Sequence, residues 1–297
     1  MASNSVHAPP TPITEQVHLP GNCILHVTRL GTGPIPVVCL HGGPGLWDYF
    51  SSLTPRLTSL ATVHTYDQRS CGRSFPAPPP YTIATWIADL ERLRVHWGVN
   101  RWVLLGHSFG ATFALAIPER CHGLIYVSGT GVADPGWHGR YRANRTTLLG
   151  EEGARELQEI KHKVKERPAT VVPRAFAVYQ TLERQACEMS WATDFACYAT
   201  EPERARQMVR EQLLNKCYWS PNFEVNRLLG EDAEKFAEKE DFDAKHRLDV
   251  ALREVPVLAG SAWGGRSKAC GCGEGVGRKD TRCPVCEDVG RRTLAVA

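Results

Sequence analysis

The sequence has no long apolar run and no segment typical of secretion. No stretch approaches the roughly 18 consecutive apolar residues of a transmembrane helix. The N-terminal segment MASNSVHAPPTPITEQ has neither a positively charged start nor an apolar stretch, which excludes an ordinary secretory signal there. We therefore expect a cytoplasmic protein that spans no membrane, with residues 1–13 forming a disordered lead-in rich in Pro and Ser.

A strong net charge is also lacking. The formal net charge is +3, and residues 261–297 carry seven Lys/Arg against four Asp/Glu, so the rest of the chain is neutral overall. A neutral chain gives no electrostatic reason to expect a nucleic acid or membrane partner. The 297 residues, 42% of them hydrophobic, are enough for one large α/β domain with an inserted subdomain.

Cysteine, by contrast, is abundant. Seven of the 11 cysteines are scattered, several in apolar runs such as PVVCL, and without a secretory signal we expect reduced, partly buried thiols. The other four lie in the C-terminal tail: Cys270, Cys272, Cys283 and Cys286. Four thiolates can hold a tetrahedral zinc ion, but a C-x-C paired with a C-x-x-C is a weaker pattern than two C-x-x-C pairs. The favoured interpretation is a tail unrelated to the fold of the rest of the chain, and no cofactor is predicted.

The first half of the chain alternates strand and helix patterns. Strands are predicted at 23–31, 36–43, 61–69, 101–108 and 123–129, and helices at 46–57 and from Ile83 to Gly98. Strand–helix–strand repetition predicts an α/β fold with a mostly parallel sheet and helices on both faces.

The β signal then disappears. Residues 133–247 are rich in Glu, Arg, Lys, Ala and Leu and read as an inserted all-helical cap. One more buried strand, EVPVLAG (254–260), returns to the sheet. The predicted organisation is a core of 14–132 and 248–260, the cap, and a Gly- and Cys-rich tail (261–297) with no clear period.

Two glycine-rich motifs carry the chemistry. The segment GHSFG (106–110) lies between a buried strand and a helix, the setting of a nucleophile elbow that exposes Ser108 on a tight turn. The segment HGGPG (41–45) follows another strand, and its glycines let the backbone approach a bound carbonyl group. We predict that the N–H groups of Gly43 and Phe109 form an oxyanion hole. The alternative for each motif is a simple small-residue turn.

A third motif, DQRSCGRS (67–74), follows the strand at 61–69. We predict a buried ion pair between Asp67 and Arg69 that orders the loops around the site rather than taking part in the chemistry.

These three segments, in this order, resemble the proline iminopeptidase family of α/β-hydrolases over residues 15–258. The resemblance implies release of an N-terminal residue, typically proline, from a small peptide or amide by acyl transfer through Ser108. It also implies that cap carboxylates bind the free amine of the substrate. Asp194 and Glu224 are the candidates, and a solvated helix carboxylate is the alternative for each.

The chain departs from the family pattern where the rest of the triad belongs. In this fold the acid and the histidine follow the serine, on loops after the last strands. Here no histidine follows His246, and no aspartate follows the last strand before Asp280. The triad acid and histidine are therefore unassigned, with a histidine of the cap region, His138 or His162, as a possible substitute. Two other functions stay open: an impaired or inactive family member that binds peptides or partners, and a small ester or amide hydrolase.

Overall fold

The computed structural model describes residues 10–114, 117, 120–129, 137–166, 173–214, 221–238 and 256–260. Most of the predicted lead-in, the end of the predicted cap with His246, and the whole tail lie outside these ranges. The zinc hypothesis for Cys270, Cys272, Cys283 and Cys286 therefore stays a prediction.

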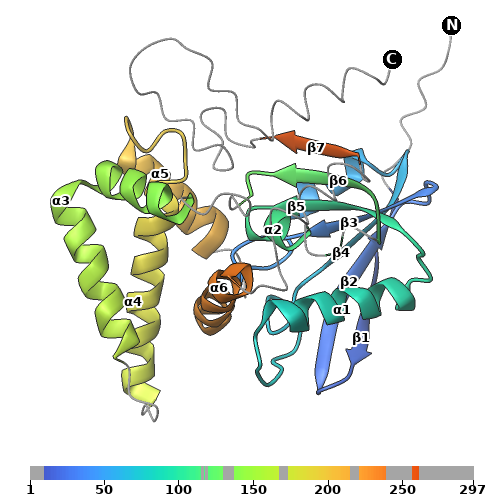
Figure 1. Ribbon diagram of the computed structural model, residues 1–297, viewed down its shortest axis with the longest axis horizontal. Coiled ribbons are helices and arrows are strands. Elements are labelled where there is room, and N and C mark those ends of the chain that lie inside the picture. The colour runs from blue at the N-terminus through green and yellow to red at the C-terminus, as the bar shows by residue number, and fades with distance from the viewer. Residues whose placement is uncertain are drawn as a thin grey trace, which may run out of the picture.

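A seven-stranded sheet forms the centre of the fold (Figure 1). Its strands are β1 (Ile13–Leu19), β2 (Cys23–Leu30), β3 (Ile35–Leu40), β4 (Ala61–Tyr66), β5 (Trp102–His107), β6 (Cys121–Val127) and β7 (Val257–Gly260). They lie in the order β1-β2-β4-β3-β5-β6-β7. The pairs β1–β2 and β2–β4 are antiparallel, and all other pairs are parallel. The predicted mostly parallel sheet is confirmed.

Strand β1 is the element that the sequence patterns did not predict. It pairs antiparallel with β2 along its full length, from Ile13 opposite Arg29 to Leu19 opposite Cys23. Only Val17 of its seven residues is buried. A strand with a single buried residue lacks the alternation of apolar and polar positions by which strands are read from sequence.

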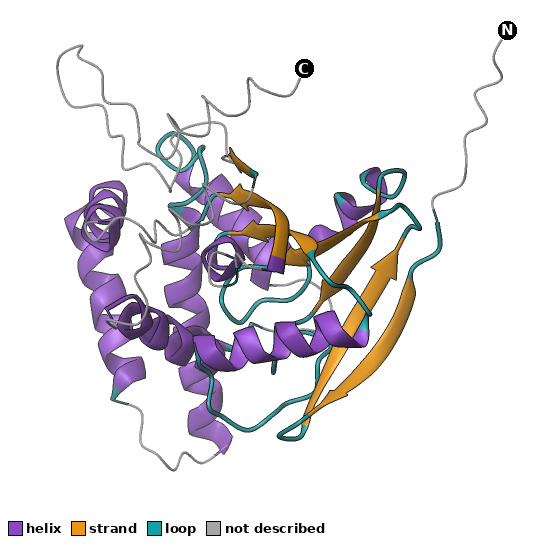
Figure 2. Cartoon of the chain, turned by 45° about the vertical axis from the view of Figure 1, so that its right-hand side comes forward, coloured by secondary structure: helices purple, strands orange, loops and turns teal. Residues whose placement is uncertain are grey.

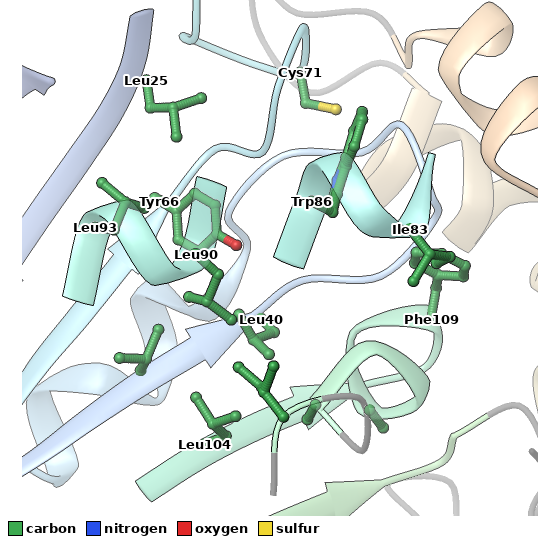
Figure 3. Packing of buried hydrophobic residues seen from close by; sticks show 14 of the residues in the cluster. Leu25, Leu40, Tyr66, Cys71, Ile83, Trp86, Leu90, Leu93, Leu104 and Phe109 are labelled. Carbon is green, nitrogen blue, oxygen red and sulfur yellow. The ribbon is translucent and has the colours of Figure 1, made fainter. Parts of the chain in front are cut away.

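Helix α1 (Ile83–His96) covers one face of the sheet. The Thr82 side chain caps its first turn by accepting the Thr85 N–H, and Gly98 follows its end with φ +65°. The spacing of Trp86, Leu90 and Leu93 places all three toward the strands (Figure 3). This confirms the helix predicted from Ile83 to Gly98.

The helix predicted at 46–57 is wrong. The segment forms two short 3₁₀ turns, Phe50–Ser52 and Thr54–Arg56. Pro55 has no N–H to continue a helical ladder, and the Asp48 carboxylate draws the Phe50 N–H into a local turn at 3.0 Å.

The described parts of the predicted insertion consist of helices joined by turns, with no strand among them (Figure 2). Its helices are α3 (Trp137–Lys165, interrupted at Gly150), α4 (Pro173–Ala192), α5 (Pro202–Val209) and α6 (Phe223–Glu238). A π-helical turn, Arg210–Leu214, follows α5. None of the helices in the described ranges has the length and apolar character to cross a membrane.

The helices of the cap do not form one unit. Helices α3, α4 and α5 contribute to two apolar clusters of their own, separate from the core of the sheet. Helix α6 instead inserts Val225 and Leu229, both fully buried, into the main core cluster beside α1 and the strands. Each such side chain contributes roughly 1.5–3 kcal/mol by its burial. Helix α6 is therefore held to the sheet domain more firmly than its place in the chain indicates.

The six scattered cysteines in the described ranges are free thiols, as predicted, and Cys217 lies outside these ranges. Cys23, Cys39, Cys71 and Cys121 are buried, and Cys187 and Cys197 are half-buried. Burial raises the pKa of Cys23 to about 11, so this side chain acts as a small apolar core residue.

Candidate active site

Ser108 occupies a sharp turn between β5 and helix α2 (Phe109–Ala114). Its φ of +55° is left-handed, which is uncommon for any residue other than glycine. The Ser108 N–H donates to the Val127 carbonyl at 2.9 Å, which holds the turn against β6. A Cβ at Gly106 would lie 2.4 Å from the Ala111 Cα, and one at Gly110 2.0 Å from the carbonyl oxygen at the end of β3. The predicted tight strand–turn–helix geometry is confirmed.

The HGGPG loop (41–45) lies directly against this turn. A Cβ on Gly42 would approach the Ser108 Cβ to 2.8 Å, so the loop and the serine are in immediate contact. The φ of +126° at Gly43 is a conformation that other residues rarely adopt. No hydrogen bond to the Gly43 N–H is found in the described part of the chain, which fits the predicted oxyanion donor.

Gly42 is held by a residue that the sequence did not single out. Its N–H donates to the Tyr49 hydroxyl at 2.6 Å, and the hydroxyl lies 2.7 Å from His107 Nδ1. Burial raises the pKa of Tyr49, so the phenol keeps its proton, and its oxygen links the Gly42 N–H to His107. Through Tyr49, the Nδ1 of the histidine beside the serine supports the HGGPG loop.

His41 makes hydrogen bonds that support the surrounding loops. Its Nδ1 donates to the Gly42 carbonyl at 3.0 Å, and its Nε2 accepts the Gln68 N–H at 3.0 Å. Burial lowers the pKa of His41 below its ordinary value of 6.5, so the ring stays neutral. Both ring nitrogens are occupied, which leaves His41 no nitrogen to take a proton from Ser108.

The predicted ion pair between Asp67 and Arg69 is wrong. Asp67 pairs with Arg73, whose Nε lies 2.6 Å from its carboxylate, and it also accepts the N–H groups of Asp48 and Arg73. Arg69 instead makes two hydrogen bonds, of 2.8 and 2.7 Å, to Asp89 on α1. The Asp67 carboxylate is already surrounded by donors within the loop, so Arg69 reaches the carboxylate that α1 supplies.

The charge state of Asp67 follows from these contacts. Burial raises the pKa of the carboxyl group, but the hydrogen bonds and charge of Arg73 outweigh burial and lower it below its ordinary 3.8. Asp67 is therefore ionised and bound to the loop. The expectation that this motif supports the site rather than reacting agrees with the contacts of Asp67 and Arg69.

The two cap carboxylates come from different elements. Glu224 is exposed in the first turn of α6. Asp194 follows α4, is half-buried, and accepts the Tyr141 hydroxyl at 3.0 Å. Within the described residues no hydrogen bond joins either carboxylate to Ser108. Their role in binding an amine stays a prediction.

No histidine in the described ranges hydrogen-bonds the Ser108 hydroxyl. His122 is exposed on β6, and His162 is exposed on α3 with its Nε2 3.2 Å from Glu166. The His138 side chain and His246 lie outside the description. The described residues also contain no cluster of three His, Cys, Asp or Glu suited to a metal ion. The triad acid and histidine stay unassigned.

Comparison with known proteins agrees with this geometry. Residues 35–156, which include the strand–loop segments around Gly43 and Ser108, match the family of the alpha/beta hydrolase fold. The chain has an α/β-hydrolase fold. A proposed epoxide hydrolase from Pseudomonas aeruginosa has a similar structure, with a TM-score of 0.51 and 21% sequence identity over 84% of this chain and 78% of the other. At that identity the likeness shows the fold alone.

The resemblance of this chain to proline iminopeptidases is also confirmed. It is 35% identical over 102 residues to the proline iminopeptidase of Neisseria gonorrhoeae, covering 31% of each chain. It is 43% identical over 83 residues to that of Xanthomonas citri, covering 27% of this chain and 26% of the other. The matches thus span less than a third of the length of these relatives.

Several residues that shape the site were not predicted. Tyr49 and Asp89 were missed because their partners lie elsewhere in the chain, and Arg73 because the same loop offers Asp67 two arginines. Asn222 could have been found, since an Asn just before a helical pattern is a common N-cap and here its Oδ1 accepts the Val225 N–H at 3.0 Å. The further contacts of Asn222 follow from packing alone.

Proposed function

We propose that this chain is a serine hydrolase that releases an N-terminal proline or similar residue from peptides through an acyl-enzyme on Ser108. The observation that carries the proposal is the left-handed turn at Ser108, packed against the HGGPG loop. The partial similarity to proline iminopeptidases supports the substrate class.

In the proposed reaction, Ser108 Oγ attacks the carbonyl carbon of the N-terminal residue. The N–H groups of Gly43 and Phe109 stabilise the oxyanion, and the start of α2 adds its positive end to that site. The C–N bond then breaks, the departing amine takes up a proton, and water hydrolyses the ester to free the acid and Ser108. Asp194 and Glu224 are the candidates that hold the free amine of the substrate.

The reaction needs a base for the Ser108 proton, and this requirement supports a second candidate function. Both ring nitrogens of His41 are hydrogen-bonded, His107 Nδ1 is bonded to Tyr49, and the chain has no histidine after residue 246. A family member without a base would be catalytically impaired and would serve by binding peptides or other partners. Triad knockouts in serine proteases keep only about 10³–10⁴-fold acceleration over water.

One experiment separates these functions. The purified protein is treated with a fluorophosphonate probe, with proline p-nitroanilide and with p-nitrophenyl acetate, beside a Ser108→Ala variant. Labelling and proline release that Ser108→Ala abolishes support the peptidase. Turnover of the ester alone points to the small ester hydrolase. Neither labelling nor turnover would refute the enzyme proposal and leave the binding protein.

A further inference from the structure

The first two turns of α6 are bonded to two loops of the hydrolase core. The Asn222 N–H donates to the Gly45 carbonyl at 2.8 Å, and its side-chain amide donates to the Ser70 carbonyl at 2.9 Å. One turn later, Asn226 Nδ2 donates to the Pro44 carbonyl at 2.7 Å. Helix α6 therefore contacts the HGGPG loop twice and the DQRSCGRS loop (67–74) once.

The approach of α6 to the HGGPG loop is too close for any side chain between them. A Cβ at Gly45 would lie 2.3 Å from the Asn222 carbonyl oxygen and 3.2 Å from the Asn226 nitrogen. Further along the helix, Asp232 accepts the N–H of Ile83 at the start of α1, at 2.8 Å. Together with the burial of Val225 and Leu229, these contacts fix both the position and the rotation of α6.

The Asn226 contact is not explained by helix stability. Capping is already provided by Asn222, whose Oδ1 accepts the Val225 N–H. Asn226 lies in the next turn, where the backbone groups are bonded along the helix, as its own N–H is to the Asn222 carbonyl at 2.9 Å. Its side-chain amide thus serves the loop rather than the helix.

These contacts lie on one side of Gly43, and the Tyr49 contact lies on the other. Gly42 is held through Tyr49 and His107, whereas Pro44 and Gly45 are held by Asn226 and Asn222. We propose that Asn222 and Asn226 are positioning residues that hold the Gly43 N–H in place for the oxyanion. The inference rests on the proposed function, because it assigns a purpose to the same site.

This arrangement couples substrate binding at α6 to the position of the Gly43 N–H. The helix that carries Glu224, a candidate for binding the substrate amine, is also the helix that holds the HGGPG loop. Contacts made with α6 on substrate binding would reach Gly43 through the Asn222 N–H and the Asn226 side chain.

The test uses Asn226→Asp, which keeps the shape of the side chain but replaces the donor to Pro44 with an oxygen. Arg227→Ala is the matched control, because this exposed neighbour on α6 pairs only with Glu231 among the described contacts. We expect kcat for proline p-nitroanilide to fall about three- to tenfold in Asn226→Asp, the range for loss of one hydrogen bond, with KM unchanged. An aldehyde analogue of proline, which forms an oxyanion on Ser108, should lose affinity by a similar factor, whereas proline itself should not.

A second measurement does not depend on activity. Hydrogen exchange of the amides in 42–48 should accelerate about three- to tenfold in Asn226→Asp and stay unchanged in Arg227→Ala. If the fluorophosphonate probe does not label the wild-type protein and the protein does not hydrolyse proline p-nitroanilide, the proposed function fails. Hydrogen exchange alone then decides whether Asn226 is a positioning residue. Unchanged exchange, or a kcat equal to that of Arg227→Ala, would overturn the inference. If Asn226→Asp does not fold, Asn226→Ala takes its place with the same expected results.

Discussion

His64 makes the stability of this protein sensitive to mild acid. The side chain lies on β4, is 3% exposed, and packs on Trp97 with the ring centroids 4.3 Å apart. Its Nδ1 is buried without a hydrogen-bond partner among the described residues. Burial, assisted by the charge of Arg29 and opposed by Glu15, lowers the pKa of His64 from 6.5 to about 4.

The sign and size of the effect follow from this shift. Between pH 6.5 and 4 the unfolded chain binds a proton at His64 that the folded protein does not bind, so stability falls as the pH falls. Above pH 6.5 both states are neutral at this site, and the full stability is present. A shift from 6.5 to about 4 corresponds to about 3 kcal/mol, at roughly 1.4 kcal/mol per pKa unit.

The assay is urea unfolding at a series of pH values from 7.5 to 4 for wild type and His64→Phe. The Phe ring keeps the contact with Trp97 but cannot take up a proton. The free energy of unfolding of the variant should therefore fall by about 3 kcal/mol less than that of wild type over this pH range. Burial also lowers the pKa values of His26 and His41, but both proteins contain them, so they cancel in the comparison. The control His18→Phe, at an exposed position of β1, should follow wild type. Parallel pH profiles for wild type and His64→Phe would refute the reasoning.

Three further substitutions test the supports of the site. Asp89→Ala leaves Arg69 buried without its partner and should cost about 3–5 kcal/mol in urea unfolding, whereas Glu91→Ala, at a half-exposed pair on the same helix, should cost at most about 1 kcal/mol. Gly110→Ala places a Cβ 2.0 Å from a β3 carbonyl oxygen, so we expect loss of the folded protein in a thermal melt. Gly230→Ala on α6 meets nothing within 4 Å and should raise the free energy of unfolding by about 0.5–1 kcal/mol. Equal melting temperatures for the two glycine variants would contradict the packing described at Gly110.

The features predicted correctly are those with a local cause. The sequence predicts helix α1 because Trp86, Leu90 and Leu93 recur at helical spacing. It predicts the turn at Ser108 because glycines flank the serine in the sequence. The sequence does not predict strand β1, because its position at the edge of the sheet leaves only Val17 buried. The segment at 46–57 has apolar residues at suitable spacing, but Pro55 and the Asp48 side chain favour short turns.

The sequence by itself determined the α/β class, the helical insertion and the meeting of the HGGPG loop with the turn at Ser108, because parallel strands bring their carboxyl ends to one edge of the sheet. Only the tertiary structure decided which charges pair: Asp67 binds Arg73, and Arg69 crosses to Asp89 on α1. It also decided that α6 packs with the sheet and holds the HGGPG loop through Asn222 and Asn226. Those contacts join segments as far as 182 residues apart, and such partners are selected by packing, which no local pattern records.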